Sequence, residues 1–295
     1  MTRRLLAALA TVLALGATLV TTAPGAAAAA RNGTCESGEF CLYYNSGRAG
    51  SLVDLTTSQR DYGTGAGCVA FLGAGNGKGQ CVKNNTASVW NRTSGPVSVF
   101  YNSDFGGVYQ VVASGASVDL SAALKNENAS QIVGDASLRF PLAVTRAQIT
   151  SRSPHWCSTN NANCHHDYNA ADIFAATGTA VVSPVAGTVK TVNVRSTGVG
   201  STVTVKDRFG RLWYFAHMHH RPAPVVTPGQ QVVKGQRIGT VGTSAHALGT
   251  DPHLHIDMRV GVDSRVSCSG AACAGYGFVN NQPILRTAFA ALPAG

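Results

Sequence analysis

The sequence predicts a mostly β protein with two β-rich domains. Short runs rich in Val, Thr and aromatic residues alternate with Gly, Asn, Ser and Pro turns along most of the chain, which is typical of strands joined by tight turns. No stretch has the apolar period of a long helix. Once an N-terminal leader is set aside, the remaining length exceeds that of a usual single domain, so we expect two.

Residues 1–30 are predicted to be a secretory signal peptide. Arg3 and Arg4 precede an apolar run from Leu5 to Val20, and small residues follow up to Ala30. This order of charge, apolar core and cleavage site is typical of a signal. The run is short and alanine-rich for a transmembrane anchor, and no later segment could span a membrane. We therefore expect a secreted, extracellular or wall-associated protein without stable membrane association.

Eight cysteines follow this leader, and an even number in a secreted chain predicts disulfides. They form four close pairs in chain order, Cys35 and Cys41, Cys68 and Cys81, Cys157 and Cys164, and Cys268 and Cys273. Consecutive pairing would place two bridges in each half. Connectivity stays open at this point, because sequence alone does not fix it.

Residues 31–135 contain an internal repeat. Residues 40–46 (FCLYYNS) resemble residues 97–103 (VSVFYNS), and glycines follow both segments. Residues 84–88 (NNTAS) likewise resemble residues 126–130 (NENAS). A strand, an aromatic hairpin and a returning segment with Ser resemble the Greek key of βγ-crystallins, and this predicts a βγ-crystallin-like domain.

Residues 35–44 and 85–91 narrow this resemblance to small secreted metalloproteinase inhibitors of crystallin-like fold, over roughly residues 33–135. Crystallin folds serve inhibition, calcium binding and simple structure, so the fold does not fix the role. The Asn-rich segments could bind calcium through oxygen ligands, but they are poor in carboxylates. Ordinary turn chemistry explains the same residues.

Residues 136–152 are predicted to be a linker, and residues 153–295 a second β-rich domain with strands at 179–182, 187–194, 201–206, 211–218 and 253–260. Charge divides the chain at the same place. Residues 31–140 carry eight basic and eight acidic residues, whereas residues 141–295 carry thirteen and six. A basic secreted half suits a polyanion such as the bacterial wall. Nucleic acid is not expected, because the basic residues are scattered and no nucleic-acid motif is present.

All nine histidines follow residue 140. They include three groups: His165 and His166 with Asp172 nearby; His217 with His219 and His220; and His253 with His255. A catalytic zinc needs three such imidazole or carboxylate ligands and one open position. His253 and His255 alternate along a strand, so they share a face about 7 Å apart. One can bind the metal while the other acts on water. His219, His220 and His246 are interpreted as surface or groove residues.

Several motifs in this half resemble lysostaphin-type zinc endopeptidases, in the family's order. They are residues 166–172, residues 178–189, the YFAHM segment at 214–218, residues 232–239 and the PHLHID segment at 252–257. The resemblance implies that His166, Asp172 and His255 bind zinc and that His217 and His253 are catalytic. The family's first motif is His-x-x-x-Asp, but Tyr168 occupies that His position, so His165 remains an alternative to His166.

The resemblance implies a secreted zinc metalloendopeptidase that hydrolyses stem or cross-bridge peptides of peptidoglycan. The alternatives are a broader secreted metalloprotease, or an inactive protein that binds wall or inhibits metalloproteases. The N-terminal domain could shield the active groove, place the enzyme on the wall or support folding. The sequence predicts no oligomeric state.

Overall fold

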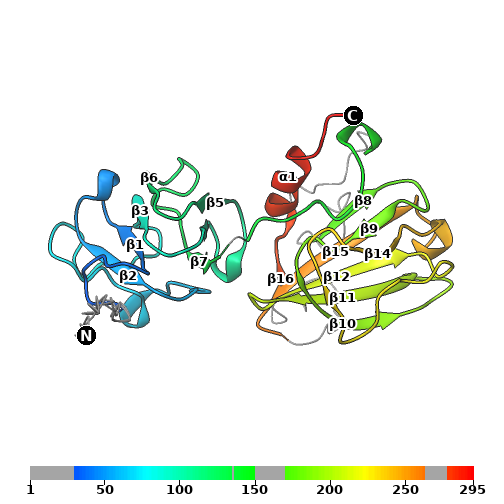
Figure 1. The fold of residues 1–295 in the computed structure, drawn as a ribbon, viewed down its shortest axis with the longest axis horizontal. Helices are drawn as coiled ribbons and strands as arrows, with labels where there is room; N and C mark the ends of the chain where they lie inside the picture. Colours follow the sequence, from blue (N-terminus) through cyan, green and yellow to red (C-terminus); the bar gives the residue numbers. More distant parts are fainter. Residues whose placement is uncertain (1–29, 135, 150–169, 263–277) are drawn as a thin grey trace, which may run out of the picture.

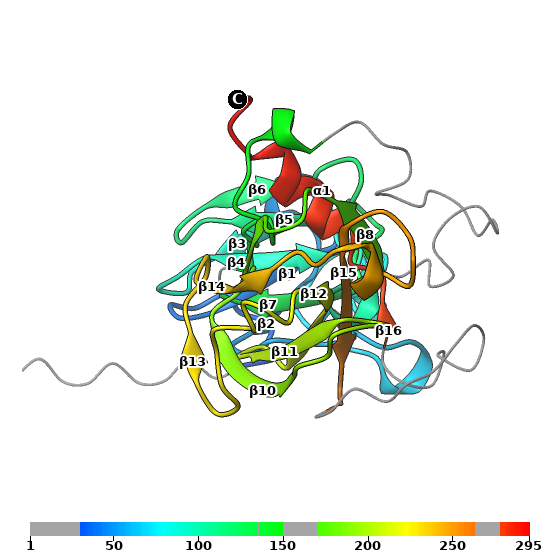
Figure 2. The same ribbon diagram turned by 90° about the vertical axis from the view of Figure 1, so that its right-hand side faces the viewer.

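The computed structural model describes residues 30–134, 136–149, 170–262 and 278–295. Two groups of strands lie at the two ends of the molecule, β1 to β7 at one end and β8 to β16 at the other (Figure 1). Figure 2 views the molecule from the end that carries β8 to β16. The predicted mostly β fold is confirmed.

The N-terminal group contains two antiparallel sheets. One has the strand order β2-β1-β3-β6 and the other β5-β4-β7. The elements are β1 (Phe40–Tyr43), η1 (Ser46–Arg48), β2 (Leu52–Leu55), η2 (Gly65–Gly67), β3 (Ser88–Asn91), β4 (Val97–Phe100), η3 (Ser103–Phe105), β5 (Tyr109–Val112), β6 (Ser117–Asp119) and β7 (Ser130–Val133).

The repeat in the sequence corresponds to a repeated hydrogen-bond pattern. In the first unit the Ser88 hydroxyl donates to the Asn45 carbonyl at 2.6 Å, and in the second the Ser130 hydroxyl donates to the Asn102 carbonyl at 2.6 Å. Each serine begins a strand that returns beside the unit's first strand, β3 beside β1 and β7 beside β4. The serine thereby ties the returning strand to the aromatic hairpin in both units.

The predicted disulfides are present in this domain, and the structure shows that they join neighbouring cysteines. Cys35 is bonded to Cys41 and Cys68 to Cys81. The other four cysteines lie outside the described residues, so their pairing stays a prediction.

Residues 136–149, which fall in the predicted linker, pack along the C-terminal half. Phe140 and Leu142 are buried in the core that also contains the C-terminal strands. The Val182 amide donates to the Pro141 carbonyl at 2.8 Å, and the Ala143 amide donates to the Ala180 carbonyl at 3.0 Å. This segment therefore adds an edge to the second domain. The domain boundaries remain a proposal.

The C-terminal group is built on a seven-stranded antiparallel sheet with the order β13-β10-β11-β12-β15-β16, in which β8 also pairs with β15. Strands β14 and β9 form a separate pair. The elements are η4 (Arg146–Gln148), β8 (Ala171–Phe174), β9 (Ala180–Val182), β10 (Gly187–Asn193), β11 (Ser201–Asp207), β12 (Arg211–Met218), β13 (Gln231–Val232), β14 (Arg237–Thr240), η5 (Ser244–His246), β15 (His253–Val260), β16 (Phe278–Val279) and α1 (Gln282–Ala290).

All five strands predicted for this half are present. No helix of convincing length was expected in this half, and the structure has one short helix there among the described residues, α1, which spans Gln282–Ala290. The helix has Pro283 in its first turn, where proline lacks only an amide that would be unpaired anyway. Ile284, Leu285 and Ala288 are buried on one side. A nine-residue helix has too few turns to give a clear periodic signal, and its stability comes from this tertiary burial.

The two groups of strands meet at one end of β15. Phe105 of η3 and Val279 of β16 belong to the same buried cluster, and a Cβ atom on Gly106 would lie 2.4 Å from the Val279 side chain. Val279 pairs with Met258, which follows His253 by about 17 Å along the strand at about 3.4 Å per residue. The contact therefore lies away from the histidine end of β15. In the part of the chain described here, no helix has the length and apolar character needed to cross a membrane.

Candidate metal centre

Four of the predicted site residues come together on three neighbouring strands. Strand β15 lies between β12 and β8, and its His255 is directly opposite Asp172 of β8 and Ala216 of β12. His217 follows Ala216, and His253 precedes His255 by two positions on the same face. The sheet register thus brings Asp172, His217, His253 and His255 to one place. His165 and His166 lie outside the described residues.

Asp172 contacts two of the three imidazoles. Its Oδ1 atom is 3.0 Å from Nδ1 of His255 and 3.7 Å from Nε2 of His253. The ring centroid of His217 lies 4.5 Å from that of His253 and 5.9 Å from that of His255. All three histidines are buried, whereas the Asp172 carboxylate keeps partial access to solvent.

A β-bulge directs the His217 side chain into this group. Between β11 and β12, the register passes from Ser201 opposite Met218 to Val203 opposite Phe215, so β12 has one extra residue. His217 has a φ of 60°, which is uncommon for a residue with a side chain. Bulges are frequent beside active sites because they re-aim a side chain. The strained backbone is held by hydrogen bonds from the His217 amide and to its carbonyl.

Backbone carbonyls set the tautomers of His217 and His253. Nδ1 of His217 is 2.7 Å from the His246 carbonyl, and Nδ1 of His253 is 2.7 Å from the Asp251 carbonyl. A carbonyl oxygen only accepts, so each Nδ1 must carry the proton. Each neutral ring therefore has its lone pair on Nε2. Two imidazoles with basic Nε2 atoms are suited to accepting protons from water or a substrate.

The electrostatic surroundings shift the pKa values of the three rings in different directions. Burial lowers the pKa of His217 to about 4, helped by the neighbouring His253 and His255. Burial also lowers the pKa of His253, although Asp172 opposes this. For His255, burial acts in the same direction, but the carboxylates of Asp172 and Asp257 outweigh it and raise the pKa to about 9. At pH 7 the first two rings are therefore neutral bases.

The donor set fits a zinc ion. The 3.0 Å between Asp172 Oδ1 and His255 Nδ1 is close to the roughly 3.3 Å that separates two ligands of a tetrahedral zinc with bonds of about 2.0 Å. The other ring nitrogen of His255 lies 3.7 Å from Asp257 Oδ2. A carboxylate behind a histidine is a common support for a zinc-binding imidazole, because it fixes the orientation of the ring.

Sequence reasoning missed the supporting residues. His246 was interpreted as a surface or groove residue, but its side chain is only 2% exposed and its carbonyl holds His217. His219 and His220 are partly buried beside it. The spacing of Thr243 and His246 resembles a helix capping box, which is the one signal that could have indicated a structural role.

Comparison with known proteins agrees with this geometry. Residues 166–267 match Peptidase family M23, and residues 28–112 match Peptidase inhibitor family I36. The second domain is an M23 peptidase domain. An I36 inhibitor-family domain precedes it. Asp172, His217, His253 and His255 all lie within the M23 match, and the crystallin-like repeat overlaps the I36 match.

Individual relatives share 30% sequence identity or less with this chain. An uncharacterized metalloprotease of Haemophilus influenzae is 30% identical over 137 residues, which are 44% of this chain and 26% of that protein. The chain thus spans about a quarter of the length of this curated relative. The M23 protein EnpA of Enterococcus faecalis, in a catalytic-domain mutant, is 24% identical with a TM-score of 0.32, over 44% of this chain and 90% of that one.

Two further solved structures are similar to the two halves. The catalytic domain of lysostaphin from Staphylococcus simulans is 22% identical with a TM-score of 0.32, over 44% of this chain and 86% of that one. A structure described under the evolution of the eye lens βγ-crystallin domain fold is 20% identical with a TM-score of 0.25, over 32% of this chain and 84% of that one.

Proposed function

We propose that this protein is a secreted zinc metalloendopeptidase that hydrolyses peptide bonds in the stem or cross-bridge peptides of peptidoglycan. The observation that carries the proposal is the convergence of Asp172, His217, His253 and His255 within an M23 domain, with the Nε2 atoms of His217 and His253 left as proton acceptors. His166, Asp172 and His255 would hold the zinc, with His165 as the alternative to His166.

A zinc ion in this site would supply Lewis acidity, lowering the pKa of a water molecule and polarising the scissile carbonyl. The protein's own part is proton transfer and positioning. A neutral imidazole, His217 or His253, accepts a proton from water at Nε2 and later delivers it to the leaving amine. The imidazolium formed by this proton transfer carries N–H on both ring nitrogens, so it can stabilise the developing oxyanion until it gives the proton up. The lowered pKa values of both rings keep Nε2 free at neutral pH.

The choice of peptidoglycan rests on the lysostaphin-type motifs and on charge. The half of the chain that carries the site has a net charge of +7, from thirteen basic and six acidic residues at positions 141–295. A basic surface raises the local concentration of a polyanionic substrate such as a bacterial wall. A broader peptide specificity is the alternative within the same chemistry.

Secretion is part of the proposal. Residues 1–30 have the order of a signal peptide, and the disulfides Cys35–Cys41 and Cys68–Cys81 are of a kind that persists in oxidising compartments.

The I36 match favours a second candidate function for the N-terminal domain, which is inhibition of metalloproteases. In this reading the domain acts on another protease, since its contact with the M23 domain lies at the far end of β15 from His253.

The test is digestion of purified, insoluble peptidoglycan, with mass spectrometry of the soluble fragments. We expect new amino termini from peptide-bond cleavage, their loss after treatment with a chelator and their return with added zinc. His217→Ala is the matched control, because it removes a base but no proposed ligand. Undiminished hydrolysis by the chelated protein, or by His217→Ala, would contradict the mechanism. Cleavage of unrelated peptides at equal rates would support the broader protease.

A further inference from the structure

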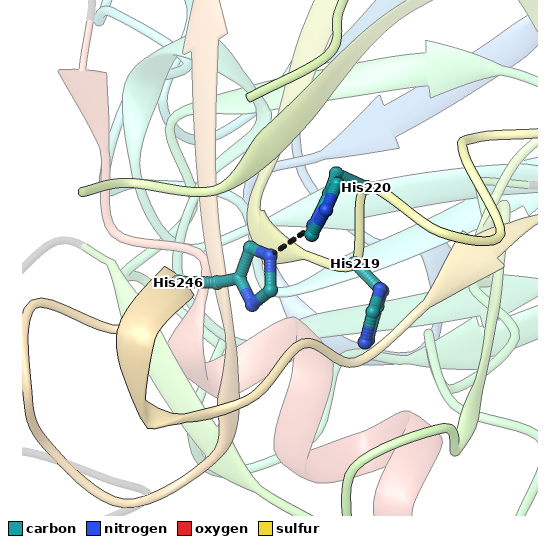
Figure 3. Close-up of side chains that lie close together, drawn as sticks. All are labelled: His219, His220 and His246. Atoms are coloured by element: carbon teal, nitrogen blue, oxygen red, sulfur yellow. Dashed lines mark hydrogen bonds between the residues drawn. The ribbon is translucent and has the colours of Figure 1, made fainter. Parts of the chain in front are cut away.

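Three histidines outside the proposed zinc site form a second group, which we call the histidine cluster: His219, His220 and His246 (Figure 3). One ring nitrogen from each lies within 4.8 Å of the others. His219 and His220 follow the end of β12, and His246 ends η5. The cluster adjoins the proposed active site, because the backbone of His246 bonds the ring of His217.

The cluster does not fit a metal ion. Nδ1 of His219 accepts the Arg221 amide hydrogen at 2.9 Å, and Nδ1 of His246 accepts the Thr243 amide hydrogen at 3.0 Å. A neutral imidazole whose Nδ1 accepts must carry its proton on Nε2. Metal-binding histidines show the reverse pattern, in which the nitrogen away from the metal donates to a carbonyl or carboxylate. Two of the three rings would thus offer N–H groups to a cation.

The same hydrogen bonds give His246 a structural role. Its Nε2–H faces Nδ1 of His220 at 2.8 Å (Figure 3), so both of its ring nitrogens have partners. Burial lowers the pKa of His246, which agrees with a neutral ring. By accepting the Thr243 amide hydrogen, the ring completes a capping box around η5. Such a box fixes the first turn of a helix and the direction of the chain.

The capped turn is held tightly against His217. The Gly242 amide donates to the His217 carbonyl at 2.8 Å, while the His246 carbonyl accepts from Nδ1 of His217 at 2.7 Å. A Cβ atom on Gly242 would lie 2.7 Å from the His217 carbonyl and 2.8 Å from Cβ of His246. A Cβ atom on Gly200 would lie 2.8 Å from Cβ of His246. Only glycines allow this close approach.

We infer that His246 is a positioning residue, whose capping imidazole places its own carbonyl so that His217 keeps the Nδ1–H tautomer and its left-handed backbone. Unusual backbone conformations persist where the surrounding structure over-determines them, and here the amide, carbonyl and ring of His217 are all bonded. The effect of His246 on catalysis rests on the proposed function. The His217 tautomer, and the poor fit of the histidine cluster to a metal ion, do not depend on that function.

The chain offers a matched set of variants. Glutamate and glutamine are the usual residues at the N3 position of a capping box, and this chain has such a box at η4, where Gln148 pairs with Thr145. His246→Gln therefore keeps the cap and removes the imidazole, whereas His246→Ala removes both. Gln148→Ala loses the same kind of cap at η4, outside the histidine cluster, and serves as the control.

Each variant is assayed on peptidoglycan for kcat and KM, and zinc per chain is measured separately. We expect His246→Ala to lose about 100-fold in kcat, as a slight misplacement of a reacting group can cost. KM and zinc content should stay within about twofold, since neither substrate binding groups nor ligands are removed. His246→Gln and Gln148→Ala should keep kcat within about threefold of the unchanged protein. A loss in His246→Gln as large as in His246→Ala would overturn the positioning role.

A second measurement does not depend on activity. Long-range ¹H–¹⁵N NMR of the imidazoles reports each tautomer directly. We expect Nδ1–H for His217, Nε2–H for His219 and His246, and mixed tautomers for His217 in His246→Ala alone. If His217 keeps a single Nδ1–H tautomer in His246→Ala, the inference is refuted. A zinc content that falls by one ion per chain in His246→Gln would also refute it. Both results hold even if no peptidoglycan is cleaved. The unchanged protein tests the tautomers if His246→Ala does not fold.

Discussion

His255 makes the stability of the metal-free protein depend on pH. Its Nδ1 lies 3.0 Å from Asp172 Oδ1, and its Nε2 lies 3.7 Å from Asp257 Oδ2. Burial opposes the charged form of His255, but the two carboxylates together raise its pKa from 6.5 to about 9. The protonated imidazole therefore stabilises the folded chain relative to the unfolded one when no metal is bound.

The pKa shift fixes the sign and the size of the effect. Because the folded pKa lies above the unfolded one, the stabilisation is fully present below pH 6.5 and is lost as the pH rises through 9. One pKa unit corresponds to about 1.4 kcal/mol, so the free energy of unfolding should fall by about 3 kcal/mol across this range. His217, whose pKa is lowered from 6.5 to about 4, changes the stability mainly between these two pH values, so its effect fades as the pH rises above 6.5.

The assay is urea unfolding of chelator-treated protein at several pH values from 6.5 to 9.5, with His255→Gln as the matched control. The free energy of unfolding should decline with pH in the unchanged protein and stay nearly level in the variant. Saturating zinc should abolish the decline, because a zinc-binding imidazole has already released its proton. Parallel curves for the metal-free protein and the variant would refute the reasoning.

Three other predictions follow from the site and from the contact between the domains. Asp172→Ala should lose most bound zinc, whereas His217→Ala should keep zinc and lose most turnover. Zinc analysis measures the first quantity and peptidoglycan digestion the second. A full zinc content in Asp172→Ala would show that Asp172 is not a zinc ligand. Of the two adjacent histidines, His166→Ala should lose zinc and His165→Ala should retain it, and the opposite result would reverse the assignment. A chain that begins at residue 136 should be no faster than the full chain on a small soluble peptide, because the I36 domain contacts the end of β15 away from His253; a faster short form would indicate autoinhibition.

Local patterns in the sequence were sufficient for the strands that carry the site. The predicted strands at 211–218 and 253–260 coincide with β12 and β15. Alternation along β15 placed His253 and His255 on one face, opposite the buried Leu254 and Ile256. The repeated serines also marked equivalent positions in the two Greek-key units. These features depend on the alternation of apolar and polar residues over a few positions and on turn-forming residues, and both can be read from the sequence.

The remaining elements had weaker local signals. Strands β13 and β16 have two residues each, and α1 has nine. Such short segments have too few periodic positions to be recognised as strands or helices from the sequence. Their structure is stabilised by the neighbouring elements on which they pack.

By itself, then, the sequence determined which residue types bear the chemistry and on which strand face the paired histidines lie. Only the tertiary structure decided which groups meet. Asp172 bonds His255 across 83 positions of chain, and the His246 carbonyl reaches His217 across 29. These contacts depend on sheet register, on a bulge at His217 and on the close approach that Gly242 allows. No local pattern encodes them, because non-local pairing is set by how whole strands pack together.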